Sequence, residues 1–216
     1  KKTGAKIVYG PNAKADFKFK TLNDGEVLTL GKIKIKAIHT PGHTLESTCY
    51  LLINENGDQK ALFSGDTLFI GDVGRPDLAV KTDLSREDLA GLLFDSLRNK
   101  ILPLNDNIIV YPAHGSGSAC GKSMSNETFD SLGNQKKINY ALKEGLSKKE
   151  FIKELLKDIL PSPLYFPKNA QMNSTKEKKE IDQIISLGTK ALSLEELDRE
   201  VGQGALILDV RSQKEF

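Results

Sequence analysis

Alternating apolar and polar residues dominate the first part of the chain and predict β-strands. Residues 27–30 and 33–38 alternate on either side of a turn at Gly31 and Lys32, which is the pattern of a β-hairpin. Further strands are expected at 6–9, 48–53, 61–63 and 107–111. The turn residues at 54–58 close the strand at 48–53.

Helical spacing replaces this alternation after residue 83. The apolar positions are Leu89, Leu92, Leu93 and Leu97. They follow a cap at Asp83 or Ser85, and Pro103 ends this unit. Residues 130–142 are also predicted to be helical.

Two capping boxes mark the starts of later helices. Ser147 and Glu150 predict a helix through Leu160, while Ser193 and Glu196 predict a short helix. The second helix should end near Val201, before an apolar strand at 205–210. Strands and helices that alternate along the chain predict an α/β or α+β class.

Composition indicates a soluble globular protein. The chain has 216 residues, enough for one large domain or two small ones, of which 38% are apolar and 28% charged. Its apolar runs are shorter than the roughly 18 residues of a membrane helix. The net charge is +2 and lysines are scattered, so we expect neither a membrane nor a nucleic acid as partner. Only two cysteines, Cys49 and Cys120, suit a reducing compartment, and we expect the cytoplasm.

Three polar residues stand at equivalent places along the chain. His43, Asp66 and His114 each follow an apolar strand at a glycine-containing turn. Loops at strand ends often hold active sites because the sheet fixes their positions. Each residue alone would be interpreted as a surface or turn residue, but three in order predict a metal site for zinc, iron or manganese. His39 lies at a strand end and is interpreted as structural, and Cys49 as a buried filler.

The segments around these residues resemble a known family. TPGHT at 40–44, GDTLF at 65–69 and PAHG at 112–115 resemble the later metal motifs of the metallo-β-lactamase fold, in the order found in glyoxalase II and its relatives. The resemblance implies an αββα sandwich. It also implies an earlier His-x-His-x-Asp-His motif, which we expect upstream of Lys1 together with the N-terminal half of the domain.

A second set of segments narrows the resemblance to iron-dependent persulfide dioxygenases. GDVGRPD at 71–77 resembles their Gly-Arg-x-Asp segment. Residues 115–122, GNQKK at 133–137 and YFPKN at 165–169 resemble a branch fused to rhodanese domains. LILDVR at 206–211, followed by Glu215 and Phe216, is similar to the opening strand of a rhodanese domain. We therefore expect a metallo-β-lactamase-like domain at 1–160, a connector at 161–188 and a truncated rhodanese-like start at 189–216.

The resemblance also implies roles for individual residues. Fe(II) would be held by His43, Asp66 and a histidine of the upstream motif, while His114 orients substrate or water. In a dinuclear zinc hydrolase His114 would instead be a ligand and Asp66 a bridge. The substrates would be O2 and a low-molecular-weight thiol persulfide, oxidised to sulfite. The thiol carrier stays open among glutathione, coenzyme A and bacillithiol.

Two further residues have alternative interpretations. Arg75 is expected either to clamp a substrate carboxylate or to pair with Asp77. Cys120 either carries a persulfide near the metal, with Lys122 lowering its thiol pKa, or is inert. As whole-chain alternatives, the sequence fits a zinc thioester hydrolase of glyoxalase II type, or an inactive fragment or binding module. We expect these 216 residues alone to be inactive. A homo-oligomer is compatible with the sequence.

Overall fold

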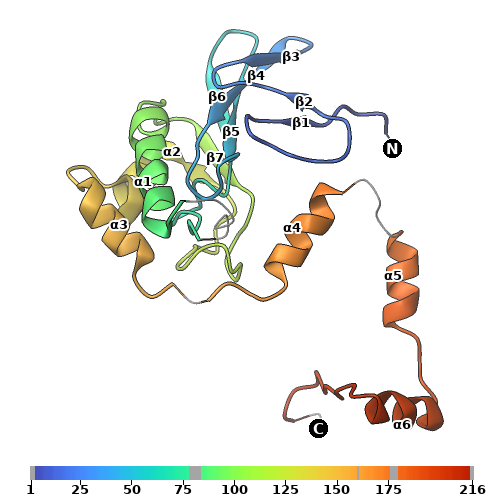
Figure 1. The fold of residues 1–216 in the computed structure, drawn as a ribbon. Helices are drawn as coiled ribbons and strands as arrows, with labels where there is room; N and C mark the ends of the chain where they lie inside the picture. The colour runs from blue at the N-terminus through green and yellow to red at the C-terminus, as the bar shows by residue number, and fades with distance from the viewer. Residues whose placement is uncertain (1–2, 78–83, 160, 176–179, 215–216) are drawn as a thin grey trace. The chain divides into compact units, whose positions relative to one another are not determined.

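A six-stranded sheet forms the centre of the structure, a computed structural model that describes residues 3–77, 84–159, 161–175 and 180–214 (Figure 1). Its strands lie in chain order: β3 (Val27–Leu30), β4 (Ile33–His39), β5 (Thr48–Ile53), β6 (Gln59–Gly65), β7 (Ile109–Pro112) and β8 (Asp130–Ser131). Neighbouring strands are antiparallel except β6 and β7, which are parallel. The predicted hairpin and the strand at 48–53 are confirmed.

Helices lie together on one side of this sheet (Figure 1). They are α1 (Arg86–Ser96), its π-helical continuation η1 (Leu97–Ile101), α2 (Leu132–Ile138), the 3-10 turn η2 (Tyr140–Leu142) and α3 (Lys148–Leu156). Strand residues such as Leu51, Leu62 and Val110 form one apolar cluster with Leu93 of α1 and Phe151 of α3. The mixed α/β class predicted from the sequence is thus confirmed.

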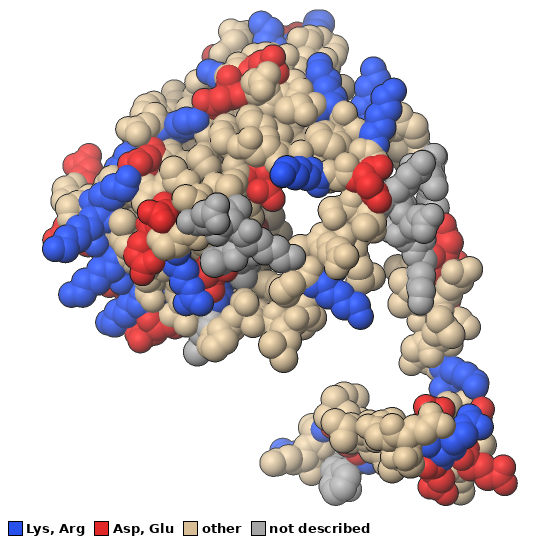
Figure 2. Space-filling view, in the orientation of Figure 1, with Lys and Arg blue, Asp and Glu red and all other residues tan. Residues whose placement is uncertain are grey.

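Smaller elements complete the first part of the chain. β1 (Val8–Tyr9) and β2 (Lys20–Thr21) pair in parallel as a separate two-stranded sheet. The next helix along the chain after α3 is α4 (Phe166–Ser174). None of the helices in the described ranges has both the length and the apolar character needed to cross a membrane. Lys and Arg side chains are interspersed with Asp and Glu over the face seen in Figure 2.

The helix predicted at 130–142 is wrong in its extent. Asp130–Ser131 pairs with β7 as strand β8, and the Ser131 side chain then caps α2. Asn139 has extended backbone and caps η2, so the segment divides into strand, helix and turn. Strand pairing and local caps outweigh the helical pattern here.

Helix boundaries after the capping boxes differ in detail. Ser85 caps α1 with a full capping box, while the alternative Asp83 lies outside the described residues. The helix begun by Ser147 ends at Leu156, short of the predicted Leu160, which is also not described.

Residues 177–216 form a separate compact unit, distinct from 1–176. It contains α5 (Ile181–Gly188) and α6 (Leu194–Gly202), and Ser193 caps α6 with the predicted capping box. The strand predicted at 205–210 is not formed: these residues have no regular structure and are exposed. A strand needs a neighbour for its backbone hydrogen bonds, and no segment within 180–214 supplies one. The domain boundaries expected at 160 and 188 stay predictions.

The sheet face opposite the helices carries exposed aromatic side chains. Phe63 stacks on Tyr111, whose ring in turn contacts that of Phe129, with centroids 5.8 Å apart in each pair. These three side chains are 40–55% exposed. An apolar, solvent-facing sheet surface of this kind is typical of an interface.

Candidate metal centre

Strand direction brings three loops to one edge of the sheet. β5 is antiparallel to both β4 and β6, and β6 is parallel to β7, so β4, β6 and β7 all run the same way. His43, Asp66 and His114 follow the carboxyl ends of these three strands. The sheet therefore places the three residues at the same edge, as the sequence predicts.

The side chains of these residues meet at Asp66. His43 Nε2 lies 3.2 Å from Asp66 Oδ2, and His114 Nδ1 lies 3.0 Å from Asp66 Oδ1. The predicted convergence of the three residues is confirmed as geometry. Their roles as ligands stay predictions.

The backbone carbonyl of Arg75 fixes the tautomer of His43. His43 Nδ1 lies 2.7 Å from this oxygen, which only accepts, so Nδ1 carries the proton and donates. In the neutral ring the bare lone pair of Nε2 then faces the carboxylate of Asp66. Either a second proton or a metal cation between the two atoms removes this repulsion. A donor N–H held by a carbonyl on the far side of the ring is the usual support of a metal-binding histidine.

Asp66 supplies a carboxylate that suits a cation. Its Oδ1 atom is buried and has no hydrogen-bond partner in the described residues, although His114 Nδ1 lies 3.0 Å away. Burial acts to raise the pKa of Asp66, but the adjacent His43 and His114 outweigh it and hold the pKa below its usual value. An ionised carboxylate with an unsatisfied oxygen between two imidazoles fits a zinc or iron ion.

The loops that carry the site are tied to their surroundings. The Thr40 hydroxyl bonds that of Thr67 at 2.8 Å, and Ser96 of α1 donates to the Pro41 carbonyl at 2.8 Å. A side chain at Gly74 would lie 2.0 Å from the Asp66 carbonyl oxygen and 2.9 Å from His43 Nδ1. Only glycine permits this approach, which explains the glycine before Arg75.

Cys120 also lies at the centre. One ligand atom each from Asp66, His114 and Cys120 lie within 4.8 Å of one another. Burial raises the pKa of the Cys120 thiol, and the carboxylate of Asp66 acts in the same direction. The expected lowering by Lys122 is therefore wrong: the Lys122 ammonium bonds the Glu154 carbonyl at 2.8 Å instead.

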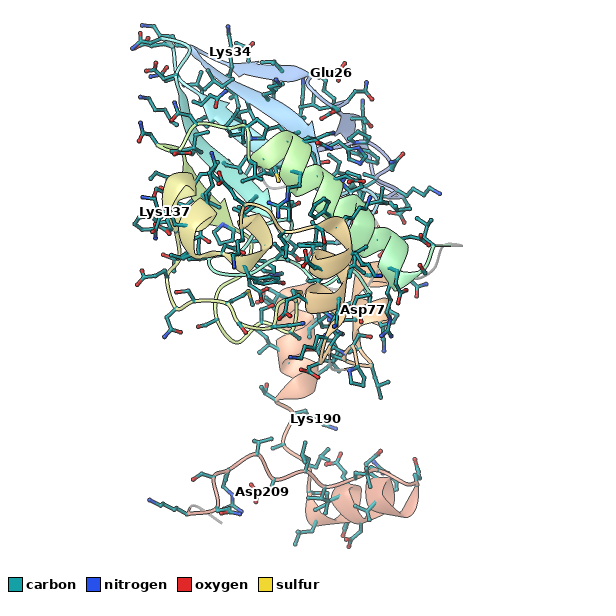
Figure 3. The ribbon with its side chains drawn as sticks, turned by 90° about the vertical axis from the view of Figure 1, so that its left-hand side faces the viewer. Glu26, Lys34, Asp77, Lys137, Lys190 and Asp209 are labelled. Atoms are coloured by element: carbon teal, nitrogen blue, oxygen red, sulfur yellow. The ribbon has the colours of Figure 1, made fainter. Side chains whose placement is uncertain are left out.

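Arg75 forms a buried ion pair. Its Nε and Nη2 donate to the two carboxylate oxygens of Asp77 at 2.6 and 2.7 Å, and their side chains are only 8% and 2% exposed. Figure 3 shows Asp77 far from Glu26 and Lys34, which lie at the β3–β4 end of the sheet. The ion pair agrees with one of the two predicted roles of Arg75, pairing with Asp77. The other role, a clamp for a substrate carboxylate, stays a prediction.

The remaining candidates lie away from the centre. His39 Nε2 donates to the Leu45 carbonyl at 2.8 Å, which agrees with a structural role. Cys49 is fully buried within the core. The GDVGRPD segment contains Asp72, a buried carboxylate next to the Cys120 loop, but its sequence gives this residue no role, because a single Asp in a glycine-rich segment is usually part of a turn.

Comparisons with known proteins identify the family. Residues 2–114, more than half of the chain, match the metallo-beta-lactamase superfamily. The chain belongs to this superfamily, whose members bind divalent metals such as zinc or iron and are typically metalloenzymes.

Two solved structures and two curated proteins are among its relatives. A metallo-beta-lactamase from Staphylococcus aureus has a TM-score of 0.74 and 32% identity, over 82% of this chain and 53% of that one. ETHE1 from Myxococcus xanthus has a TM-score of 0.62 and 29% identity, over 80% and 66%. Hydroxyacylglutathione hydrolases from Haemophilus influenzae (GloC) and Dictyostelium discoideum are 36% and 38% identical over 49% and 50% of this chain. The chain spans 45% and 37% of these two relatives.

Proposed function

We propose that the complete protein is an iron-dependent persulfide dioxygenase. It would oxidise the sulfane sulfur of a low-molecular-weight thiol persulfide to sulfite, with O2 and water as the other reactants. His43 and Asp66 would hold Fe(II), with a third ligand from a histidine outside these 216 residues. A sulfurtransferase domain of rhodanese type would follow the metallo-β-lactamase-like domain.

The position of the Cys120 sulfur carries this proposal. It lies within 4.8 Å of ligand atoms on Asp66 and His114. A thioester hydrolase has no need of a protein thiol at this place, whereas in a persulfide enzyme a thiol beside the metal can accept the sulfane sulfur of the substrate. Bound ferrous iron would supply the redox chemistry with oxygen.

The side chains around the metal would have distinct tasks. The Arg75 carbonyl accepts the hydrogen bond of His43 Nδ1–H, which orients the ring so that Nε2 faces the metal position. His114 would orient substrate or water by hydrogen bonds. Cys120 would accept the outer sulfur of the small persulfide: its sulfur forms the new S–S bond, the bond to the carrier breaks, and the Cys120 thiol proton leaves with the carrier, which departs as thiol.

One observation favours a second function, a zinc thioester hydrolase of glyoxalase II type. His114 Nδ1 lies 3.0 Å from Asp66 Oδ1, on the side of the carboxylate away from His43. Asp66 would then bridge two zinc ions, and His114 would be a ligand. The similarity to hydroxyacylglutathione hydrolases agrees with this alternative.

Oxygen uptake separates the two functions. The complete protein, loaded anaerobically with Fe(II) or Zn(II), is supplied with the persulfides of glutathione, coenzyme A or bacillithiol, or with a glutathione thioester. We expect the iron form to consume oxygen and release sulfite with a persulfide only. Thioester hydrolysis by the zinc form, without oxygen uptake by the iron form, would contradict the proposal.

Substitution of the two cysteines tests the sulfur-carrying role. Cys120→Ser should lower persulfide turnover while iron content stays at the parent level, because Cys120 is not proposed as a ligand. Cys49→Ala provides the comparison, since Cys49 is buried in the core and is not among the metal-ligating side chains that gather at Asp66. Equal turnover in Cys120→Ser and the parent protein would assign Cys120 to the inert class.

A further inference from the structure

A buried carboxylate, Asp72, joins two loops beside the metal centre. It is fully buried, and its Oδ1 accepts from the Val73 N–H at 2.8 Å. Its Oδ2 accepts from the N–H groups of Lys122 and Ser123 at 2.6 and 2.8 Å. Asp72 thus binds the loop that follows Asp66 to Lys122 and Ser123, two and three residues after Cys120.

Burial of such a carboxylate lowers the stability of the fold unless its hydrogen bonds offset the loss of water. Removal of an ionised group from water is unfavourable, and backbone N–H groups offset this only through good geometry. Successive N–H groups such as those of Lys122 and Ser123 form a concave site for an anion. An apolar residue would fill the same space without this cost, but it would leave the Cys120 loop without its anchor.

Gln135 of α2 and Asn139, which lies between α2 and η2, fix the segment that carries Asp72. Asn139 Nδ2 donates to the Asp72 carbonyl at 3.0 Å. Gln135 Oε1 accepts from the Gly71 N–H at 2.8 Å, and Gln135 Nε2 donates to Asp130 at 2.6 Å. Both Gln135 and Asn139 are buried. Gln135 belongs to the GNQKK segment, so the structure gives this segment a task that its sequence does not reveal.

Close packing and backbone bonds reinforce the same junction. A side chain at Gly121 would meet Asp72 Oδ2 at 2.9 Å and Met124 Cγ at 3.0 Å. The Arg75 N–H donates to the Cys120 carbonyl at 2.9 Å, and the Ser125 N–H donates to the Ile70 carbonyl at 3.0 Å. Backbone hydrogen bonds therefore hold the loop at Cys120 and at Ser125. The Asp72 carboxylate holds it between these two positions, at Lys122 and Ser123.

We propose that Asp72 is a positioning residue that holds the Cys120 sulfur at the metal centre, beside Asp66 and His114. The importance of this position for catalysis rests on the proposed function, but the anchoring itself does not. When Asp72 is lost, the loop at 119–123 should move away from the site and expose the Cys120 thiol. Metal ligands on the strand ends should stay in place.

The reactivity of the two cysteines tests this anchoring. The folded protein is treated with iodoacetamide, and labelling of each cysteine is followed by peptide mass mapping. We expect Asp72→Ala to raise the labelling rate of Cys120 by about tenfold or more, because the loop loses its charge-assisted hydrogen bonds. Asp72→Asn should give a smaller increase, since an amide oxygen still accepts. Cys49 should stay unlabelled in every variant.

Two further variants distinguish loss of the anchor from general loosening of the fold. Gly121→Ala disturbs the same junction from the other side without removing the carboxylate, and should also raise Cys120 labelling. Asp95→Asn, which removes only an exposed ion pair with Lys148, should leave it unchanged. Parent-level labelling of Cys120 in folded Asp72→Ala and Gly121→Ala would overturn the proposal. Parallel labelling of both cysteines would also overturn it, because that indicates general loosening. Neither result depends on whether the protein takes up oxygen.

Discussion

Burial determines how the charged residues near the metal centre behave. Arg75 and Asp77 are almost completely removed from water, yet their two-pronged ion pair satisfies both carboxylate oxygens. Burial acts to raise the pKa of Asp77, but the Arg75 guanidinium outweighs it and holds this pKa below its usual value. The pair supports the backbone whose carbonyl orients His43, so it contributes to the site through structure.

Removal of one partner of this pair should destabilise the protein strongly. Arg75→Ala leaves the Asp77 carboxylate buried without its cation, and we expect the free energy of unfolding to fall by about 3–5 kcal/mol. The double variant Arg75→Met with Asp77→Leu should recover much of this loss. Urea unfolding followed by circular dichroism measures both. A loss well below 1 kcal/mol in Arg75→Ala would contradict the importance of the pair.

The same pair predicts a pH dependence. The pKa of Asp77 is lower in the folded protein than in the unfolded chain, so its stabilising contribution is complete above the unfolded value of about 3.9. The contribution is lost as the pH falls through the lower folded pKa. The stability advantage of the parent over the double variant should therefore be constant near neutral pH and shrink below about pH 4. An advantage that grows in acid would contradict this sign.

Capping boxes determine where the helices begin. Ser147 accepts from the Glu150 N–H, and the Glu150 side chain accepts from the Ser147 N–H, at the start of α3. Phe151 and Leu155 then bury the inner face of this helix. The start of α3 is thus fixed by local bonds, and its place by packing.

Loss of the α3 cap should have a measurable cost. Ser147→Ala should lower the free energy of unfolding of the first unit by about 1 kcal/mol, the usual value for an N-cap. Ser193→Ala removes the same kind of cap from α6, where no residue is buried. This control should leave the main unfolding transition unchanged. Equal effects of the two substitutions would indicate that the cap of α3 contributes nothing beyond a generic surface change.

The sequence predicts features that local patterns determine, but not those that depend on contacts between distant segments. The strand Thr48–Ile53 is predictable at its observed bounds because a turn closes its apolar run. The motif residues His43, Asp66 and His114 are recognisable because each follows a strand. The strand at Asp130–Ser131 forms because Asp130 pairs with Val110, which is distant in sequence. The Lys122 side chain likewise binds the carbonyl of the distant Glu154. No pattern within the segment itself contains that information.

At the scale of the whole molecule, the helices described within 84–159 pack together on one face of the sheet. The contacting rings of Phe63, Tyr111 and Phe129 are 40–55% exposed on the other side, where Phe63 also lines an apolar pocket with Val8 and Leu22. Each large apolar side chain left in water forgoes roughly 1.5–3 kcal/mol, against a total domain stability of about 5–15 kcal/mol. Under the proposed function, the half of the domain expected upstream would supply a further layer over this face.

This inference predicts a difference between two chain lengths. The 216-residue chain, purified with ferrous salt, should hold little iron, because only His43 and Asp66 of the proposed triad are present. A version extended upstream through the expected His-x-His-x-Asp-His motif should hold iron near one per chain and be more stable. Iron analysis and thermal unfolding of both measure this. Near-stoichiometric iron and persulfide-dependent oxygen uptake in the short chain would show that its site is already complete.

The central claim is that His43 and Asp66 belong to one metal centre at the edge of the sheet. The most direct test compares two histidines four residues apart in the complete protein, since His43 faces Asp66 and His39 bonds the Leu45 carbonyl. We predict that His43→Ala lowers metal content per chain, measured by mass spectrometry after dialysis, by about tenfold or more. His39→Ala should stay at the parent level. Full metal content in folded His43→Ala, or equal loss in both variants, would contradict the claim.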